Sequence, residues 1–418
     1  MGVLVSLSVC HCCNDTLQAV VNSLYPIIKD DLALNFVQIG IITLIYQMSA
    51  SVLQPIMGFY LDRRPNPWFL TLAACLTFTG MVFLAYANTI GLVILSVVLV
   101  GAGSSIVHPE ASRLTSLASG GRKGFAQSIF QVGGNFGGSL GPLLAALVIA
   151  PYGRNHTALV AFVAFIGIGA SILIAGWYKK LLAEADKKAM AEIGTNAAGM
   201  SSETNCAANV DVVAEAAPRK HKVVHKGDPD WIPRPYSDQK TYFVIGVLLL
   251  LIFSKYVYMA SMSSYYTFYL IDKFGVSIQN SQYALFIFTF ATALGTMLGG
   301  PIGDKIGRKY VIWASILGTA PFSIAMPFAN LEWTIVFSFG VGFMLSSAFP
   351  AIIIYAQELL PNRLGMISGL FFGFSFGIAG IAAAFWGGYA ESHGIEAVFH
   401  LSAYLPLLGI VAVLLPKR

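Results

Sequence analysis

The stretch "GPIGDKIGRKYVIW", residues 300–313, separates two long apolar runs and places Asp304 beside three basic residues. A related stretch, "GFYLDRRPNPW" at residues 58–68, aligns Asp62 with Asp304 at an offset of 242 positions. Two further pairs of segments match at nearly the same offset: 25–38 with 269–282 at 244, and 122–131 with 363–372 at 241. Three matches at nearly one offset indicate that the chain consists of two related halves.

Apolar runs of membrane-spanning length fill almost the whole chain. Of the 418 residues, 56% are hydrophobic and only 11% are charged, whereas soluble proteins carry about 25% charged residues. A run of about 20 apolar residues can cross a bilayer as a helix. We therefore predict an all-α polytopic membrane protein with twelve transmembrane helices, at approximately residues 3–28, 35–61, 68–87, 91–112, 121–149, 156–178, 241–271, 279–303, 310–329, 332–357, 363–389 and 395–416.

A polar segment at residues 181–240 divides the predicted spans six and six. We interpret it as a linker, with "KLLAEADKKAMAEI" as a possible short helix, between a six-helix bundle at 1–180 and another at 241–418. The loops on one side of the predicted membrane contain 21 Lys and Arg residues, and the loops on the other side contain three. Basic loops stay in the cytoplasm, so we expect both termini and the linker there. Duplicated six-helix halves are typical of transporters with a central site between the repeats.

Two motifs add a resemblance to a known family. The loop "GDKIGRK" (303–309) and the helix segment "GGSLGPLLAA" (137–146) resemble motifs of the major facilitator superfamily. Longer stretches, at 107–113, 119–153, 249–270 and 355–374, resemble the superfamily exporters of phosphonate antibiotics such as fosmidomycin. The resemblance covers nearly all twelve spans, and the chain departs from it in a longer linker and in few residues ahead of the first span.

The loop motif also implies a cytoplasmic gate. An Asp at a helix N-terminus complements the helix dipole, and basic residues beside it can bridge to the other half when the cytoplasmic side closes. Acid and base residues near the cytoplasmic ends of spans four and ten resemble the same network. The resemblance thus implies a gate formed by Asp62, Arg63, Asp304, Arg308, Glu110, Arg113, Glu358 and Arg363.

The first predicted span carries polar residues in the stretch "CHCCNDTLQ", residues 10–18. At 100° per residue, His11, Asn14, Asp15 and Gln18 share one face, whereas the three cysteines point in diverging directions. Zinc needs ligands that converge, so we expect no metal site among these cysteines. Ionisable residues inside a span are functional candidates, and we expect His11 and Asp15, one turn apart, to share the transported proton.

The seventh predicted span carries Lys255 on a face rich in tyrosine. By the offset of 244, Lys255 is the repeat counterpart of His11. A buried ammonium with phenol groups around it suits an anionic ligand, because Lys supplies charge and Tyr hydroxyls donate hydrogen bonds. The alternative is a structural salt bridge between Lys255 and Asp15 or another acid.

Polar residues on spans four and five complete the candidate cavity. On span five, Gln127, Gln131, Asn135 and Ser139 form an amide-rich ridge, while the glycines lie mostly on another face that we expect to pack against a neighbouring helix. The predicted substrate ligands are therefore Lys255, Tyr258, Tyr265, Tyr266, Gln18, Gln131, Asn135 and His108. For His108, a structural hydrogen bond to a neighbouring helix remains an alternative.

The resemblance implies a proton-coupled antiporter of the bacterial inner membrane that exports an anionic phosphonate drug by alternating access. It would use the proton gradient and no cofactor, and we expect a monomer in the lipid bilayer with no nucleic-acid partner. One alternative keeps the fold and exports an endogenous organic phosphate, another anion or a broader range of drugs. A membrane enzyme or sensor is a more remote alternative, since we find no nucleophile motif, no metal-ligand spacing and no soluble catalytic domain.

Overall fold

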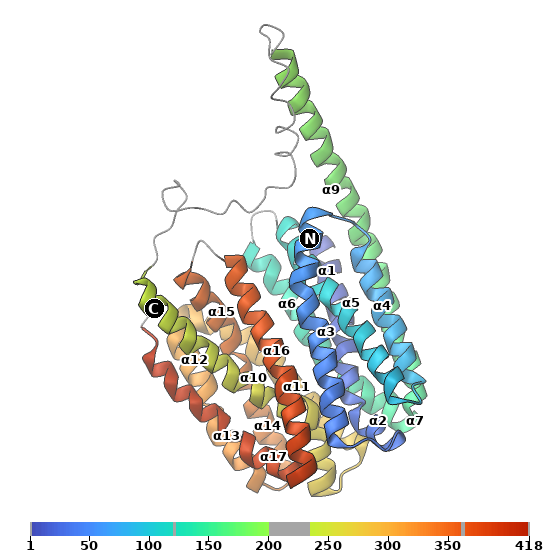
Figure 1. The fold of residues 1–418 in the computed structure, drawn as a ribbon, viewed down its shortest axis with the longest axis vertical. Coiled ribbons are helices and arrows are strands. Elements are labelled where there is room, and N and C mark those ends of the chain that lie inside the picture. Colours follow the sequence, from blue (N-terminus) through green and yellow to red (C-terminus); the bar gives the residue numbers. More distant parts are fainter. Residues whose placement is uncertain (1, 120–122, 200–234, 361–363, 417–418) are drawn as a thin grey trace.

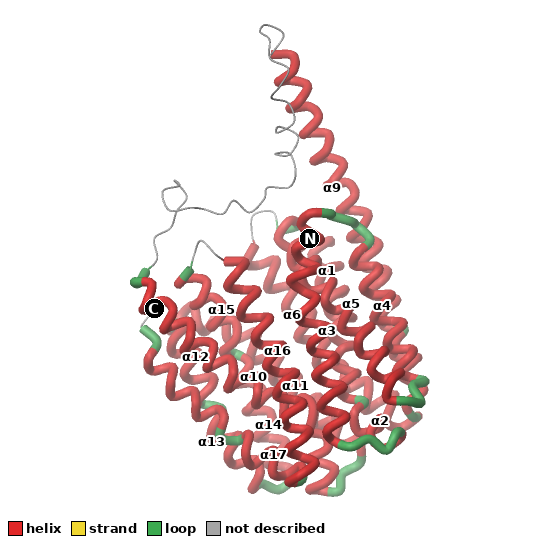
Figure 2. The backbone as a smooth tube through the Cα atoms, in the orientation of Figure 1, coloured by secondary structure: helices red, strands yellow, loops and turns green. Residues whose placement is uncertain are grey.

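The computed structural model describes residues 2–119, 123–199, 235–360 and 364–416, and within these ranges its regular structure is helical (Figures 1 and 2). The helices run side by side along the long axis of a bundle, and α9 extends beyond it at the end where the N- and C-termini lie (Figure 1). The architecture matches the all-α class predicted from the sequence.

The helices of the first half begin and end as follows: α1 (Gly2–Ser23), α2 (Tyr25–Asp31), α3 (Phe36–Arg63), α4 (Phe69–Ala85), α5 (Ile90–Leu117), α6 (Lys123–Leu144), η1 (Ala145–Ile149), α7 (Ala150–Tyr152), η2 (Arg154–His156), α8 (Thr157–Ala161) and α9 (Val163–Gly199). Side-chain caps start two of the long helices. Asn35 and Gln38 form a reciprocal capping box at α3, and the Thr89 hydroxyl accepts a hydrogen bond from the Leu92 amide at α5.

The helices of the second half are α10 (Asp238–Phe274), α11 (Ile278–Ile306), α12 (Arg308–Leu317), α13 (Ala320–Ala325), η3 (Met326–Phe328), α14 (Leu331–Ser346), α15 (Ala348–Leu359), α16 (Leu364–His393), α17 (Ile395–Ser402) and η5 (Leu405–Leu414). Gly275 ends α10 in the left-handed region at φ 63°, a conformation that glycine adopts without a Cβ penalty. Several predicted spans are thus built from two or three shorter helices in series.

Ten helical stretches in the described part of the chain are long and apolar enough to cross a membrane. The remaining two predicted spans correspond to α1, which carries the polar stretch, and to α4, which is apolar but only 17 residues long. The chain is therefore a multi-pass helical membrane protein, and the count of twelve stays a prediction.

Helix α9 differs from its predicted extent. The sixth span is predicted to end near residue 178, but α9 continues as one helix of 37 residues to Gly199. The first part of the predicted linker is thus a continuation of the span rather than a separate short helix. The reason is its Ala, Leu, Lys and Glu content, since these residues have high helix propensity. Residues 200–234 lie outside the described part.

The two halves meet along α3 with α16 and along α6 with α11. Three hydrogen bonds between the halves join chain segments at the end of the bundle opposite the termini (Figure 1). The Gln282 side chain donates to the Ser23 carbonyl at 2.8 Å, Gln279 donates to the Ala146 carbonyl at 3.0 Å, and the Phe36 amide donates to Glu391 at 2.9 Å. This end of the interface between the halves is therefore held by direct polar contacts.

Within the first half, α1 packs closely on α6. A Cβ atom on Gly133, Gly137 or Gly141 would overlap atoms of α1, at Ser8, Cys12 and Ala19 respectively. Small residues allow membrane helices to approach in this way. The predicted packing role of the glycine face is confirmed, and the close approach brings α6 against the polar stretch of α1.

Candidate functional site

The polar stretch of α1 forms an ion pair inside the first half. His11 Nε2 lies 3.1 Å from Asp15 Oδ2, one helical turn away. His11 Nδ1 lies 2.8 Å from the Phe130 carbonyl oxygen, which can only accept a hydrogen bond, so Nδ1 carries the hydrogen. The ring also stacks on the Phe130 ring, with centroids 4.0 Å apart. The His11 ring is thereby fixed with Nε2 facing the carboxylate.

A second histidine, from α5, joins this pair. His108 Nε2 lies 3.7 Å from Asp15 Oδ1, and its ring meets the His11 ring edge-on with centroids 5.1 Å apart. The His11 side chain is only 4% exposed, but Asp15 and His108 keep 22% and 26% of their side-chain surface accessible. His108 is predicted from the sequence to be a substrate ligand, and the structure places it beside Asp15. We call the group of His11, Asp15 and His108 the His–Asp–His cluster.

Gln18 orients the carboxylate of this cluster. Its Nε2 donates to Asp15 Oδ1 at 3.1 Å, and its Oε1 accepts hydrogen bonds from Tyr46 at 3.0 Å and Ser104 at 3.1 Å. These contacts join α1, α3 and α5. Both ends of the Gln18 amide thus have protein partners in this conformation, and its role as a substrate ligand stays a prediction. In this conformation Gln18 positions Asp15.

Gly134 allows the cluster to lie against α6. A Cβ atom at this position would overlap the His11 ring and would lie 2.8 Å from Asp15 Oδ2. On the same helix, a Cβ atom at Gly138 would have nothing within 4 Å. Sequence reasoning missed Gly134, because the glycines of α6 form a repeating pattern in which one position does not stand out.

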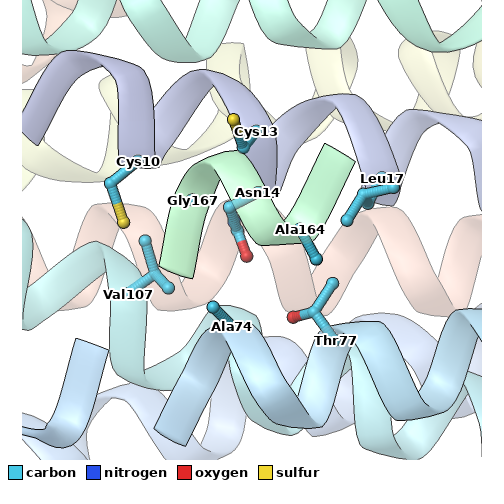
Figure 3. Close-up of a pocket in the computed structure, with 9 residues that line it drawn as sticks. All are labelled: Cys10, Cys13, Asn14, Leu17, Ala74, Thr77, Val107, Ala164 and Gly167. Atoms are coloured by element: carbon cyan, nitrogen blue, oxygen red, sulfur yellow. The ribbon is translucent and has the colours of Figure 1, made fainter. Parts of the chain in front are cut away.

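Asn14 departs from the prediction that it shares one face of α1 with His11, Asp15 and Gln18. Its side-chain nitrogen donates to Asp15 Oδ1 at 3.0 Å, but the residue points into a small pocket lined by α1, α4, α5 and α9 (Figure 3). Asn14 Oδ1 and Thr77 Oγ1 line this pocket, and both are buried without a hydrogen-bond partner among the described residues. Asn14 lies at the edge of the polar face, so its amide turns into the helix bundle.

The cysteines of α1 do not form a ligand set. Cys10, Cys12 and Cys13 are free thiols, of which Cys10 and Cys13 are buried and border the pocket of Figure 3. Within the described ranges, one group of three His, Cys, Asp or Glu side chains brings its ligand atoms within 4.8 Å of one another, and that group is the His–Asp–His cluster.

Lys255 of α10 is buried at 4% exposure. Its Nζ lies 5.3 Å from the centre of the Tyr256 ring and 5.1 Å from the centre of the Phe349 ring, within the range of a cation–π interaction. No carboxylate of the described residues is within ion-pair distance. The alternative of a salt bridge to Asp15 is therefore wrong for this structure, in which Asp15 pairs with the two histidines.

The three tyrosines predicted around Lys255 are buried in the packed interior instead, and Tyr265 lies where α10 meets α3 of the first half, near Phe36 and Gly40. Tyr258, Tyr265 and Tyr266 have no exposed surface. The Tyr265 hydroxyl donates to the Ala383 carbonyl of α16 at 2.7 Å, and the Tyr266 ring lies near two phenylalanine rings. None of the three hydroxyls forms a hydrogen bond with the Lys255 ammonium. Helical projection gives the angle of a side chain on its own helix but not the neighbour that it meets, which here is the packed interior.

On the amide ridge of α6, Gln131 is exposed and Asn135 is half-buried, and neither has a hydrogen-bond partner among the described residues. Both remain predicted substrate ligands. Ser139 is buried and donates to the Phe136 carbonyl of its own helix. The Gln127 side chain lies outside the described part.

Two of the predicted gate pairs are described, and each lies within one half. Arg113 donates two hydrogen bonds to Glu110, at 2.9 and 2.8 Å, and a third to the Tyr178 hydroxyl of α9 at 2.8 Å. Arg308 of α12 pairs with Glu358 of α15. In this conformation Glu110 and Arg113 pair along α5 itself, and the bond from Arg113 to Tyr178 joins α5 to α9. The pair of Arg308 and Glu358 joins α12 to α15 within the second half. The side chains of Asp62, Arg63 and Asp304, and the whole of Arg363, lie outside the described residues.

Comparison with known families decides the class of protein. The family model of the Major Facilitator Superfamily matches residues 7–277 and 244–418, which together cover nearly the entire chain. The chain belongs to the Major Facilitator Superfamily. It is accordingly a transporter and not an enzyme, as the sequence predicts.

Two curated superfamily relatives cover the full length of the chain. The Fosmidomycin resistance protein of Escherichia coli (strain K12) is 48% identical over 100% of this chain and 93% of its own length. An uncharacterized transporter of the superfamily, YfnC of Bacillus subtilis (strain 168), is 34% identical over 99% of this chain and 93% of its own length. The chain is thus a homologue of the Fosmidomycin resistance protein.

Solved transporter structures share the superfamily fold at low identity. A bacterial homologue of the human lysosomal transporter Spinster, in an inward-facing and occupied conformation, superposes with a TM-score of 0.70 at 14% identity, covering 98% of this chain and 93% of that one. The nucleoside transporter NupG superposes with a TM-score of 0.69 at 10% identity, covering 98% and 99%. At these identities the likeness concerns the fold alone.

Proposed function

We propose that the chain is a proton-coupled antiporter that exports anionic phosphonates such as fosmidomycin by alternating access. Its place would be the bacterial inner membrane, with twelve spans and both termini in the cytoplasm. The observation that carries the proposal is the ion pair of His11 and Asp15, buried between α1 and α6 and open to solvent on the Asp15 side. The name of the relative that is 48% identical supports the substrate class.

The geometry of the pair favours a shared proton. His11 Nδ1 donates its hydrogen to the Phe130 carbonyl. Without a second proton on the ring, His11 Nε2 and Asp15 Oδ2 would therefore be two acceptors 3.1 Å apart. A proton on Nε2 turns this repulsive contact into a charge-assisted hydrogen bond. Asp15 and His108 keep accessible surface, so a proton has a route to the carboxylate. The arrangement is suited to taking up and releasing one proton.

The charge of Lys255 suits the anion. A buried ammonium without a carboxylate partner is costly unless it is compensated, and a phosphonate would supply the compensating charge. Tyr256 and Phe349 hold the ammonium in place through their ring faces. Gln131 and Asn135 could add hydrogen bonds from the other half.

In the proposed cycle, the cytoplasm-facing state binds the anion at Lys255. We assign the present conformation to this cytoplasm-facing state. The hydrogen bonds between the halves at the end opposite the termini support the assignment, because they hold the halves together at that end. After the halves rock to the outward-facing state, protonation of the Asp15–His11 pair weakens anion binding, and the proton is released inside on return. The proton gradient would be the sole energy source, the protein would act as a monomer in the bilayer, and no nucleic acid or cofactor would take part.

A test uses purified protein in liposomes with a pH-sensitive dye inside. Fosmidomycin added to the side it is exported from should produce proton movement in the opposite direction, and Asp15→Asn should abolish that movement. Unchanged drug-dependent proton flux in Asp15→Asn would remove Asp15 from the coupling role. If an endogenous organic phosphate or another drug is the true substrate, those compounds but not fosmidomycin would drive the proton flux of the wild type.

A further inference from the structure

The His–Asp–His cluster has a second chemical property besides holding a proton. Two imidazoles and one carboxylate, from α1 and α5, place their ligand atoms within 4.8 Å of one another. Two of the separations are shorter, 3.1 Å between His11 Nε2 and Asp15 Oδ2 and 3.7 Å between His108 Nε2 and Asp15 Oδ1. The sequence predicts no metal site, because it directs attention to cysteines that diverge. The fold instead assembles a ligand set from residues that are 93 positions apart along the chain, Asp15 and His108.

These separations fit a transition-metal site. Zinc holds His nitrogen and carboxylate oxygen at about 2.0–2.2 Å, so the ligand atoms of a tetrahedral site lie about 3.3 Å apart. The separations of 3.1 Å to Asp15 Oδ2 and 3.7 Å to Asp15 Oδ1 lie close to that value, and the ligand atoms of all three residues lie within 4.8 Å of one another. Imidazole ligands select zinc and similar metals, whereas calcium and magnesium prefer oxygen ligands alone. Two histidines and one carboxylate are also the ligand set of zinc sites that keep a fourth position open.

Outer contacts orient these ligands as metal sites require. A ligating histidine usually donates its second ring N–H to a carbonyl or carboxylate, which fixes the tautomer. His11 does this through Nδ1 to the Phe130 carbonyl at 2.8 Å. The carboxylate of Asp15 accepts hydrogen bonds from Asn14 and Gln18, at 3.0 and 3.1 Å. Nε2 of His11 is thereby presented to the centre of the cluster, and the carboxylate is held in place.

One side of the His–Asp–His cluster is accessible to an ion. His11 is 4% exposed and forms the inner wall, while the Asp15 and His108 side chains are 22% and 26% exposed. An ion can therefore enter from the Asp15 side, and its open coordination position would face that side. We propose that His11, Asp15 and His108 form a binding site for one divalent transition-metal ion of the Zn²⁺ type.

The experiment measures Zn²⁺ binding to the full chain in detergent, purified without a polyhistidine tag and with neither substrate nor proton gradient present. We expect saturable binding of one Zn²⁺ per chain. His108→Gln and Asp15→Asn should each weaken it by about 10- to 100-fold or more, since even the loss of an outer partner costs that much. His108→Cys should recover binding relative to His108→Gln, because a thiolate is also a zinc ligand.

Three of the five remaining histidines supply matched controls. His156→Gln changes an exposed residue on η2, and a His221→Gln/His225→Gln double variant removes the two histidines of the linker, which lie outside the described part. Both should bind Zn²⁺ as the wild type does. Equal binding by His108→Gln and wild type, or loss of binding only in the linker variant, would overturn the proposal.

A second measurement does not depend on the folding of variants. Co²⁺ added to the wild type should give a saturable visible absorption band that Zn²⁺ abolishes, as expected for a site with nitrogen and oxygen ligands. Failure to observe such a band would contradict the proposal. Neither assay involves transport, so the two proposals can fail separately. Zn²⁺ binding without exchange of fosmidomycin for protons would refute the proposed function and leave the metal site standing. Exchange without Zn²⁺ binding would refute the metal site and leave the proposed function standing.

Discussion

The two halves of the chain carry an ionisable residue at matching positions of α1 and α10, but they surround it differently. His11 has a carboxylate, a second histidine and a backbone carbonyl as partners. Lys255, its counterpart at an offset of 244, has two aromatic rings and no carboxylate among the described residues. The two positions thus present one ionisable residue with a carboxylate partner and one with no carboxylate partner among the described residues. We interpret this difference as a division of labour between proton and anion.

The ion pairs near the ends of α5 and α15 offer the largest contrast in stability. Glu110 is 1% exposed and accepts two hydrogen bonds from Arg113, so Glu110→Gln leaves a guanidinium that is only 21% exposed without its counter-charge. We expect the free energy of unfolding to fall by about 3–5 kcal/mol. The matched change Glu358→Gln affects a carboxylate that is 39% exposed and should cost about 0–1 kcal/mol. Unfolding in detergent measures the loss in free energy for each variant. Equal losses would contradict the conclusion that Glu110 is buried and Glu358 is not.

Lys255 should show a large effect on binding and none on stability. Removal of a charged hydrogen-bond donor costs about 1.5–3 kcal/mol, so Lys255→Met should weaken fosmidomycin binding by roughly 10- to 150-fold. Because no carboxylate is left unpaired, the melting temperature should not fall. Lys255→Arg keeps the charge and should retain most of the affinity. Binding to purified protein measures the effect, and an unchanged affinity in Lys255→Met would place the anion elsewhere.

Gly134 tests the first half without changing any ionisable group. Gly134→Ala places a methyl group against the His11 ring and 2.8 Å from Asp15 Oδ2. Overpacking of this kind costs about 1–3 kcal/mol, and the displaced pair should reduce drug-dependent proton flux more than fosmidomycin binding. Gly138→Ala, one turn along α6 with nothing within 4 Å of the new methyl group, is the control. Equal proton flux in the two variants would show that the contact between α6 and the pair of His11 and Asp15 does not affect transport.

Some features of the fold and of the site could be predicted from the sequence, and others depend on how the helices pack. The hydrophobic runs were enough to predict a helical membrane protein, and the helical projection of α1 selected His11 and Asp15, because both depend on local periodicity. The transporter class followed from the duplicated halves and from the motifs that resemble the superfamily. The approach of His108 to Asp15 could not be predicted, since it depends on how α5, with Pro109 in its interior, packs on α1. The surroundings of Lys255 were missed for the same reason: the projection selected Tyr258 and Tyr266, whereas Tyr256 and Phe349 meet the ammonium in the folded chain.

The division of labour between the halves is tested most directly by two transport assays on Asp15→Asn. One follows exchange of labelled for unlabelled fosmidomycin across liposome membranes at equal pH, and the other follows fosmidomycin transport driven by a pH gradient. The account predicts that Asp15→Asn retains exchange and loses the gradient-driven transport, while Lys255→Met loses both. Loss of both activities in Asp15→Asn with substrate binding also abolished, or retention of gradient-driven transport, would contradict the account.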